Sequence, residues 1–388
     1  MTMVHAVAVV LLTHFGVVGA KLLVALFALD LGASPLEVGC VYALFSLLPA
    51  VLALTAGRWV DRVGVRAPLT IGCGTVAVSI GALWLTPGLW ALYPAAVVIG
   101  VGFLLYAIAG QSLVGAVSDP TTRTRNFSYY ALAVSMGGVF ARASTGVAID
   151  LAGHRAAALM LAAAPLAAFA LVLWLRRRMP AAPPAHAARA STSVADLWRI
   201  PALRRALIAA AVIESGNELF ALFVPLYGTQ LGLSATAIGF VLAAYAAASF
   251  AVRIGLPALV SRFGEERVLC AALFGAAATG TAMIATGNPG ALMALSAAYG
   301  LTLGCGMPLT MALTYARAPQ GRVAEAIGLR QTVNKSIEVA VPIGFGAIAG
   351  VAGVLPLAVA MGVFLASGAA VIARDARRRP APGQPSSD

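Results

Sequence analysis

Polar side chains occur inside a segment that is otherwise apolar enough to span a bilayer, residues 326–350. Gln331, Lys335 and Glu338 are spaced four and three residues apart there, so they share one face of a helix. An ionised side chain at bilayer depth costs several kcal/mol unless it faces protein or water, and such residues mark substrate or proton pathways. The segment therefore predicts a substrate-binding helix, with the binding side chains Arg330, Asn334, Lys335 and Glu338.

A second apolar segment, residues 204–229, carries Glu214 and Glu218 one helical turn apart, with Asn217 between them. Two carboxylates at that spacing in a partly desolvated site repel each other, which favours binding of a proton by one of them. We predict proton coupling by Glu214 and Glu218 and substrate binding by Asn217. The alternative is that basic residues such as Lys21 or Lys335 neutralise each carboxylate in a structural pair.

Among the other ionisable residues within apolar segments, three are candidate site residues: His14, Lys21 and Arg142. His14 precedes Glu214 by 200 residues and is predicted to relay protons, a hydrogen-bonded packing histidine being the alternative. Lys21 and Lys335 are the two lysines of the chain, and a buried lysine releases its proton more readily than arginine does. A permanently charged Arg142 suits a substrate carboxylate or phosphate. Lys21 and Arg142 are therefore predicted to bind substrate.

The composition is that of an integral membrane protein. Of 388 residues, 61% are hydrophobic and 10% are charged, and the mean hydropathy is +0.92. The net charge is +12, and the basic residues lie in short tracts between apolar runs. They are not interleaved with aromatic residues as in nucleic-acid-binding surfaces, so we expect no nucleic-acid partner. Nucleotide-binding, protease and hydrolase motifs are absent, so an enzyme is not expected. The four cysteines lack metal-ligand spacing, and we expect neither a metal nor a cofactor, with a proton gradient as the energy source.

Apolar runs of about 20 residues predict twelve membrane-spanning helices. They cover residues 4–29, 36–57, 67–86, 89–115, 127–149, 155–175, 204–229, 234–257, 268–287, 290–315, 326–350 and 353–373. The sequence thus predicts an all-α membrane protein.

The predicted helices divide into two halves. We predict an N-terminal six-helix bundle over residues 1–175 and a C-terminal six-helix bundle over residues 204–373. Residues 176–203 between them form a basic, Pro/Ala-rich linker with a short surface helix near 194–200, and residues 374–388 form a disordered tail. Arginines gather in loops on one side, whereas Arg155 alone lies on the other, which predicts that both termini and the linker are cytoplasmic. The halves repeat at an offset of 200 residues, as in transporters that bind substrate at the midplane between two pseudo-symmetric bundles.

The loop after the second predicted helix carries the pattern G-x-x-x-D-R-x-G-x-R, as Gly57, Asp61, Arg62, Gly64 and Arg66. With twelve spans and a central linker, the chain resembles the major facilitator superfamily over essentially its whole length. The resemblance implies that this loop latches the cytoplasmic gate through a carboxylate–arginine network, so these five residues are expected to act in gating. Simple topology, with arginines held on the cytoplasmic side, is the alternative.

Proton-coupled exporters of this superfamily often carry G-x-x-x-G-P-x-x-G-G on the fifth helix. Here Gly138 and Gly146 remain, but Arg142 stands in the place of the second glycine, while the eleventh helix retains Pro342, 200 residues after Arg142, and Gly346. The pattern is closer to efflux proteins than to sugar importers.

These observations predict a secondary active transporter that works by alternating access and exports a small anionic or zwitterionic organic solute by proton antiport. Proton-coupled import of an organic anion is one alternative, and a non-transporting sensor or scaffold with the same fold is another. The expected setting is a bacterial inner membrane, with membrane lipids around a monomer.

Overall fold

The computed structural model describes residues 3–85, 88–118, 123–179, 195–319 and 322–377, and within them every regular element is a helix. In the first half these are α1 (Met3–Asp30), α2 (Pro35–Val63), α3 (Arg66–Ala82), α4 (Leu92–Ala116) and α5 (Arg123–Leu175). The short helix α6 (Ala195–Arg199) follows. The second half contains α7 (Pro201–Gln230), α8 (Ala235–Phe263), α9 (Glu265–Ala282), α10 (Pro289–Leu303), α11 (Gly306–Arg317), α12 (Val323–Ala352) and α13 (Val354–Arg377).

The prediction of twelve spans is confirmed. Ten helical stretches of the described chain are long and apolar enough to cross a membrane, and the stretch Tyr129–Arg178 holds two spans because Gly153, at φ +77°, breaks α5. The shorter apolar helix Val354–Ala370 completes the set. One predicted span, 290–315, is built from α10 and α11 together.

The two halves repeat in backbone conformation as well as in sequence. Positive-φ glycines of the described chain form pairs 200 residues apart: Gly32 with Gly232, Gly64 with Gly264, and Gly153 with Gly353. Each pair ends corresponding helices, since glycine adopts this left-handed conformation at no steric cost. The helices that follow the first pair also begin alike, with Ser34 and Ser234 capping the first turns of α2 and α8.

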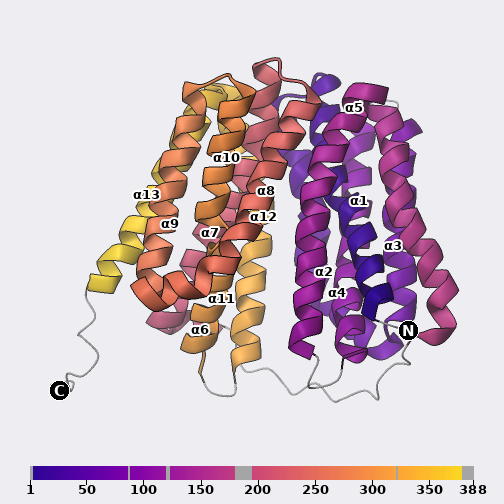
Figure 1. Cartoon of the computed structure of the whole chain (residues 1–388), viewed down its shortest axis with the longest axis horizontal. Helices are drawn as coiled ribbons and strands as arrows, with labels where there is room; N and C mark the ends of the chain where they lie inside the picture. The colour runs from indigo at the N-terminus through magenta and orange to yellow at the C-terminus, as the bar shows by residue number, and fades with distance from the viewer. Residues whose placement is uncertain (1–2, 86–87, 119–122, 180–194, 320–321, 378–388) are drawn as a thin grey trace.

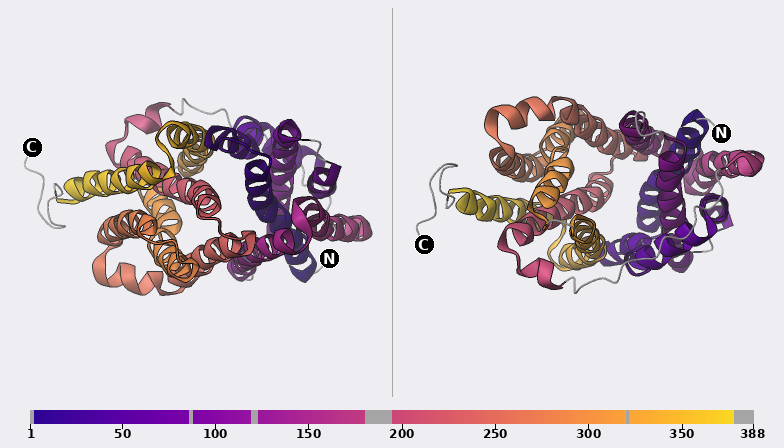
Figure 2. Two further views of the ribbon diagram at one scale, coloured as in Figure 1. Left: turned by 90° about the horizontal axis from the view of Figure 1, so that it is seen from above. Right: turned by 90° about the horizontal axis from the view of Figure 1, so that it is seen from below.

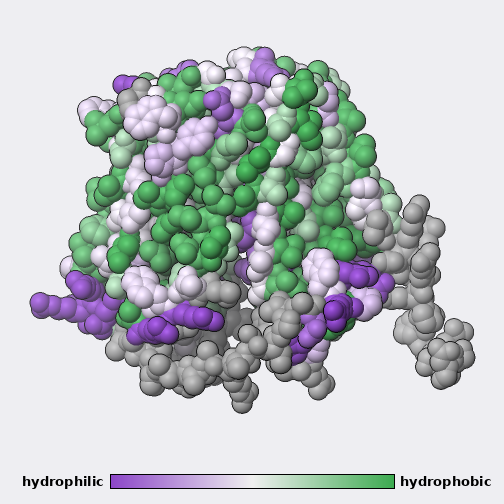
Figure 3. Space-filling model, turned by 180° about the vertical axis from the view of Figure 1, so that it is seen from behind, coloured by the Kyte–Doolittle hydropathy of each residue, from purple (hydrophilic) through white to green (hydrophobic). Residues whose placement is uncertain are grey.

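The halves stand side by side, with the first half at the right of Figure 1 and the second at the left. The short helix α6, the start of α1 and the end of α13 lie toward one end of the molecule, which we call the linker end. Seen along the helices, the two halves lie side by side (Figure 2). Figure 3 shows hydrophobic side chains over the middle of one face and hydrophilic ones along its lower edge, as expected for a membrane-spanning surface.

The predicted surface helix of the linker is observed as α6. Leu197 of α6 is fully buried against Leu203 and Leu207 of α7 and Ala326 of α12. This cluster anchors α6 to the linker end of the second half.

The halves meet closely through two helix pairs, α2 with α12 and α5 with α8, away from the linker end. Small residues make the approach possible, because there is no hydrophobic driving force between helices in lipid and close packing replaces it. A side chain at Gly239 would lie 2.5 Å from the Arg142 carbonyl oxygen, and one at Gly346 would lie 2.7 Å from that of Pro35. The protein is therefore closed at the end opposite the linker.

Asp150 strengthens this closure by linking α5 to the first turn of α8. Its carboxylate accepts hydrogen bonds from the backbone amides of Ala235 (3.0 Å) and Thr236 (2.7 Å). A negative charge at a helix N-terminus is favourable because the first amides have no partner within the helix. The corresponding contact between α2 and α12 is impossible, since Pro35 lacks an amide hydrogen and Gly350 lacks a side chain.

Replacing Asp150 with alanine is expected to lower the stability of the protein, because two α8 amides lose their acceptor. Loss of a capping side chain costs about 1 kcal/mol. We expect a Tm a few degrees lower in thermal unfolding of the detergent-purified protein. Asp150→Asn keeps one oxygen acceptor and should lose less. An unchanged Tm for Asp150→Ala would contradict a stabilising role.

Candidate functional site

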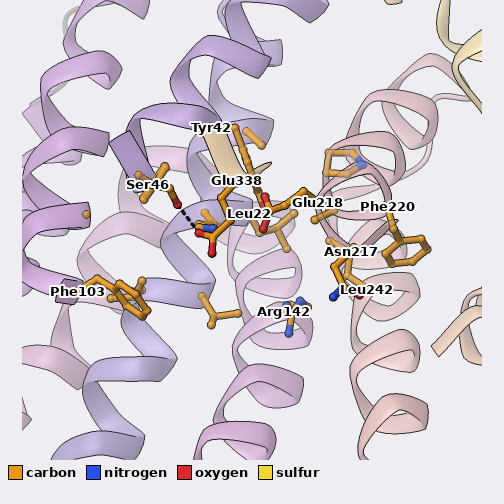
Figure 4. Close-up of a pocket in the computed structure, with 18 of the residues that line it drawn as sticks. Leu22, Tyr42, Ser46, Phe103, Arg142, Asn217, Glu218, Phe220, Leu242 and Glu338 are labelled. Carbon is orange, nitrogen blue, oxygen red and sulfur yellow. Dashed lines mark hydrogen bonds between the residues drawn. The ribbon is translucent and has the colours of Figure 1, made fainter. Parts of the chain in front are cut away.

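A cavity of about 330 Å³ lies between the two halves, near the middle of the helices (Figure 4). Helices of both halves form its wall: α1, α2, α4 and α5 from the first, and α7, α8 and α12 from the second. Its polar and charged lining residues are His14, Lys21, Tyr42, Ser46, Arg142, Asn217, Glu218, Tyr245, Lys335 and Glu338. Seven residues that the sequence singles out therefore come together here: His14, Lys21, Arg142, Asn217, Glu218, Lys335 and Glu338.

Both oxygens of the Glu338 carboxylate are occupied by donors within the protein. Lys335, one turn earlier on α12, donates to Oε1 at 2.5 Å. Ser46 of α2 donates to Oε2 at 2.5 Å, as the dashed line in Figure 4 shows. The Lys335 ammonium also lies 5.7 Å from the ring centroid of Phe103. Glu338 thus ties the two halves together at the cavity wall and is internally neutralised by Lys335.

Glu218 differs from Glu338 because one of its oxygens is unpaired. Its side chain is buried, yet Oε2 has no hydrogen-bond partner. The Lys21 ammonium lies 4.9 Å from the ring centroid of Tyr42, and Lys21 lines the same cavity as Glu218. Glu218 lines the cavity, and a buried carboxylate oxygen that lacks a partner within the protein favours binding of a proton there.

Arg142 and Asn217 add hydrogen-bond donors to the cavity. Nη1 of Arg142 donates to the carbonyl oxygen of Gly138, one turn earlier on α5, at 2.9 Å. Oδ1 of Asn217 accepts from the Tyr245 hydroxyl at 2.5 Å. The remaining guanidinium N–H groups and the Asn217 amide nitrogen are left for a ligand.

The comparisons with known proteins agree with this geometry. The sequence matches the family model for the Major Facilitator Superfamily over residues 6–342 and 206–388. The chain belongs to this superfamily. No curated protein sequence matches the chain.

Solved transporters share the superfamily fold of this chain. A POT family transporter in complex with 5-aminolevulinic acid superimposes with a TM-score of 0.81 at 12% identity, over 97% of this chain and 96% of that one. A bacterial homologue of the human lysosomal transporter Spinster, inward-facing and occupied, gives 0.78 at 15% identity, over 97% and 98%. A mutant of the nucleoside transporter NupG gives 0.77 at 13% identity, over 95% and 98%. The protein is a transporter of this fold and not an enzyme.

Three residues predicted for substrate binding or proton coupling do not line the cavity: Glu214, Arg330 and Asn334. Arg330 is buried, and its Nη2 lies 3.2 Å from the sulfur of Met311. Asn334 is buried one turn further along α12, with Oδ1 unpaired. Helical spacing places Arg330 and Asn334 on the flank of the Lys335–Glu338 face, and that flank packs inside the second half. For these three residues, a role in binding or coupling stays a prediction.

His14 lines the cavity and forms a hydrogen bond of 2.8 Å from Nδ1 to the hydroxyl of Tyr106. Tyr106 is almost completely buried. This bond is compatible with a packing histidine and with a relay whose other nitrogen faces the cavity, so the predicted relay stays a prediction.

The predicted gate residues lie where α2 ends and α3 begins: Gly57, Asp61, Arg62, Gly64 and Arg66. Gly64 ends α2 at φ +76°, and Arg62 is exposed. Arg66 donates from Nε and Nη2 to the carbonyl oxygen of Met179, at the start of the linker. The Asp61 side chain lies outside the described residues, and so does the predicted carboxylate–arginine network.

Sequence reasoning missed Tyr42, Ser46 and Phe103 as lining residues. Ser46 carried a usable signal, since a hydroxyl in an apolar helix needs a partner inside the protein. Phe103 carried none, because an aromatic residue in a membrane helix is ordinary packing. Among the described residues, no group of three or more His, Cys, Asp or Glu side chains is placed to hold a metal ion.

Proposed function

We propose that this superfamily member is a proton-coupled secondary active transporter that exports a small anionic or zwitterionic organic solute by alternating access. The observation that carries the proposal is a cavity between the halves whose wall holds charged groups of both signs, with Glu218 Oε2 unpaired. A charged group at bilayer depth is costly, and a role in transport accounts for keeping it.

The unpaired groups on the cavity wall favour this class of solute. The Lys335–Glu338 pair is satisfied internally, so Arg142, Lys21 and the Asn217 amide nitrogen remain as donors, with Glu218 as the acceptor. Several donors opposite one carboxylate match a solute with an anionic group and one cationic or donor group. The POT family neighbour is complexed with 5-aminolevulinic acid, a small amino acid that combines both groups. A cavity of about 330 Å³ suits a ligand of this size.

Glu218 also supplies a simple basis for antiport. Its carboxylate binds either a proton or the cationic group of the solute, and each excludes the other. A site that must release the proton before it binds the solute, and the reverse, exchanges the two across the membrane when the halves change between the inward-open and outward-open states. The export direction rests on the efflux-like Pro342–Gly346 pattern of α12.

The test is transport by the full chain in right-side-out and inside-out vesicles, with and without an imposed pH gradient, against a panel of small amino acids, peptides and organic acids. We expect export of an anionic or zwitterionic solute that is driven by inward proton flow. Uptake of the solute together with protons would show that the protein is a symporter and not an antiporter. No flux and no pH-dependent binding of any solute would refute the transport proposal.

A further inference from the structure

The orientation of the Asn217 amide decides which kind of ligand atom this part of the cavity accepts. The Tyr245 hydroxyl donates its hydrogen to Asn217 Oδ1 at 2.5 Å. A flipped amide would take this acceptor away from the hydroxyl hydrogen, and losing a hydrogen bond is costly for a half-buried group. The oxygen is therefore held by Tyr245, and the amide nitrogen is the polar atom left for the cavity.

Tyr245 is itself fixed by the aromatic side chains around it. Its ring lies 4.6 Å from that of Phe220, which in turn stacks at 4.9 Å on Tyr299. Tyr299 is fully buried and donates from its hydroxyl to the carbonyl oxygen of Gly216, the residue directly before Asn217. These contacts hold the hydroxyl of Tyr245 in place against α7.

Arg142 presents a second set of donors to the same cavity. Figure 4 draws its guanidinium and the Asn217 amide on the lower part of the pocket wall, from helices of opposite halves. Within the described residues, the guanidinium donates to one acceptor, the carbonyl oxygen of Gly138 on its own helix. The backbone of Arg142 is fixed as well, since its carbonyl oxygen packs against Gly239 of α8. Arg142 and Asn217, on helices of opposite halves, thus bring to one cavity further N–H donors that have no acceptor among the described residues.

We infer that Arg142 and the amide nitrogen of Asn217 form an oxyanion subsite for the carboxylate of the solute, and that Tyr245 is the positioning residue that sets its polarity. This inference deepens the proposed function and rests on it for the solute class. Arg142 belongs to α5 in the first half, whereas Asn217 and Tyr245 belong to α7 and α8 in the second. A bound oxyanion therefore links the halves, and its binding favours the state in which they are closest.

The test is equilibrium binding of sulfate, as an oxyanion probe, to the detergent-purified full chain at fixed pH and constant ionic strength, with chloride as the replaced anion. Isothermal titration calorimetry gives the Kd, and thermal unfolding without sulfate reports the fold separately. We expect Asn217→Ala to weaken sulfate binding roughly tenfold or more, since hydrogen bonds to charged groups are strong. Tyr245→Phe should weaken it by a few fold while keeping the ring stack.

A double-mutant cycle separates positioning from a general structural effect. Because Tyr245 acts through Asn217, Tyr245→Phe should change the Kd in the native background and leave it unchanged in the Asn217→Ala background. Tyr227→Phe is the matched control, because it removes another buried tyrosine hydroxyl of the second half that does not line the cavity, and it should alter the Tm without altering the Kd.

Absence of sulfate binding by the native chain would overturn the oxyanion subsite. Binding that Arg142→Gln and Asn217→Ala leave unchanged would overturn it too, and an equal effect of Tyr245→Phe in both backgrounds would overturn the role of Tyr245. The measurement uses no gradient, so these results stand apart from proton coupling and direction, which the vesicle assay decides.

Discussion

Replacing Glu218 with glutamine is expected to abolish transport driven by a pH gradient while leaving exchange of solute without a gradient. Glutamine keeps the shape of the side chain and one oxygen acceptor, but it cannot bind and release a proton. Glu218 is chosen over the other carboxyl groups because it lines the cavity and its buried Oε2 has no hydrogen-bond partner within the protein.

The measurement is accumulation in proteoliposomes with and without an imposed pH gradient, for the solute found in the vesicle panel, together with counterflow at equal pH. Glu214→Gln is the matched control, because Glu214 lies one turn away on α7 and does not line the cavity. We expect gradient-driven accumulation to fall to the level without a gradient in Glu218→Gln and to persist in Glu214→Gln. If accumulation is lost in Glu214→Gln and persists in Glu218→Gln, the proton binds to Glu214 instead. If accumulation persists in both variants, neither carboxylate of α7 is the proton site.

The fold was predictable from the sequence because the bilayer imposes a length and a composition on every span. Twelve apolar runs, the 200-residue offset and the loop from Gly57 to Arg66 suffice to predict two six-helix halves. The break between α10 and α11 inside one predicted span was not predictable, because Gly304 and Cys305 sit in an uninterrupted apolar run.

The cavity was predictable only in part, and the reason is the rotation of each helix about its axis. Spacing along the sequence places Lys335 and Glu338 on one face, and their hydrogen bond across one turn follows from that. The spacing does not determine whether this face or its flank points to the other half. Arg330 and Asn334, on the flank, are buried and do not line the cavity. Packing of α12 on α2 decides this.

Hydrogen-bond partners far apart in the sequence could not be predicted for the same reason. Ser46 and Glu338 are 292 residues apart, and nothing local in α2 indicates which carboxylate its hydroxyl meets. The pairing depends on how the two halves dock, which in turn depends on small residues that show no chemical signal of their own.

Those small residues carry the other prediction with a large expected effect. Gly39→Ala and Gly146→Ala are expected to open the end opposite the linker and to stop transport. The added methyl group at position 39 would overlap the carbonyl oxygen of Pro342, and the one at position 146 would overlap that of Ala235. Both obstacles are backbone atoms of the other half, so neither can turn aside as a side chain does.

Relief of these overlaps requires the halves to separate. Overpacking of this kind costs about 1–3 kcal/mol, which shifts a two-state equilibrium by roughly 5- to 150-fold. The transporter would then rarely reach the closed arrangement that one half-cycle of alternating access needs, and turnover should fall accordingly.

The separation is measurable as a distance between spin labels at Leu151 and Leu231, which are exposed on opposite halves near this end. The labels require a background in which alanine replaces Cys40, Cys73, Cys270 and Cys305. Gly344→Ala on α12 is the matched control, because an added methyl group there has no atom within 4 Å. We expect a longer distance and lost transport in both clashing variants, and neither change in the control. A native distance distribution in Gly39→Ala and Gly146→Ala would mean that the helix pairs α2–α12 and α5–α8 do not hold this end closed.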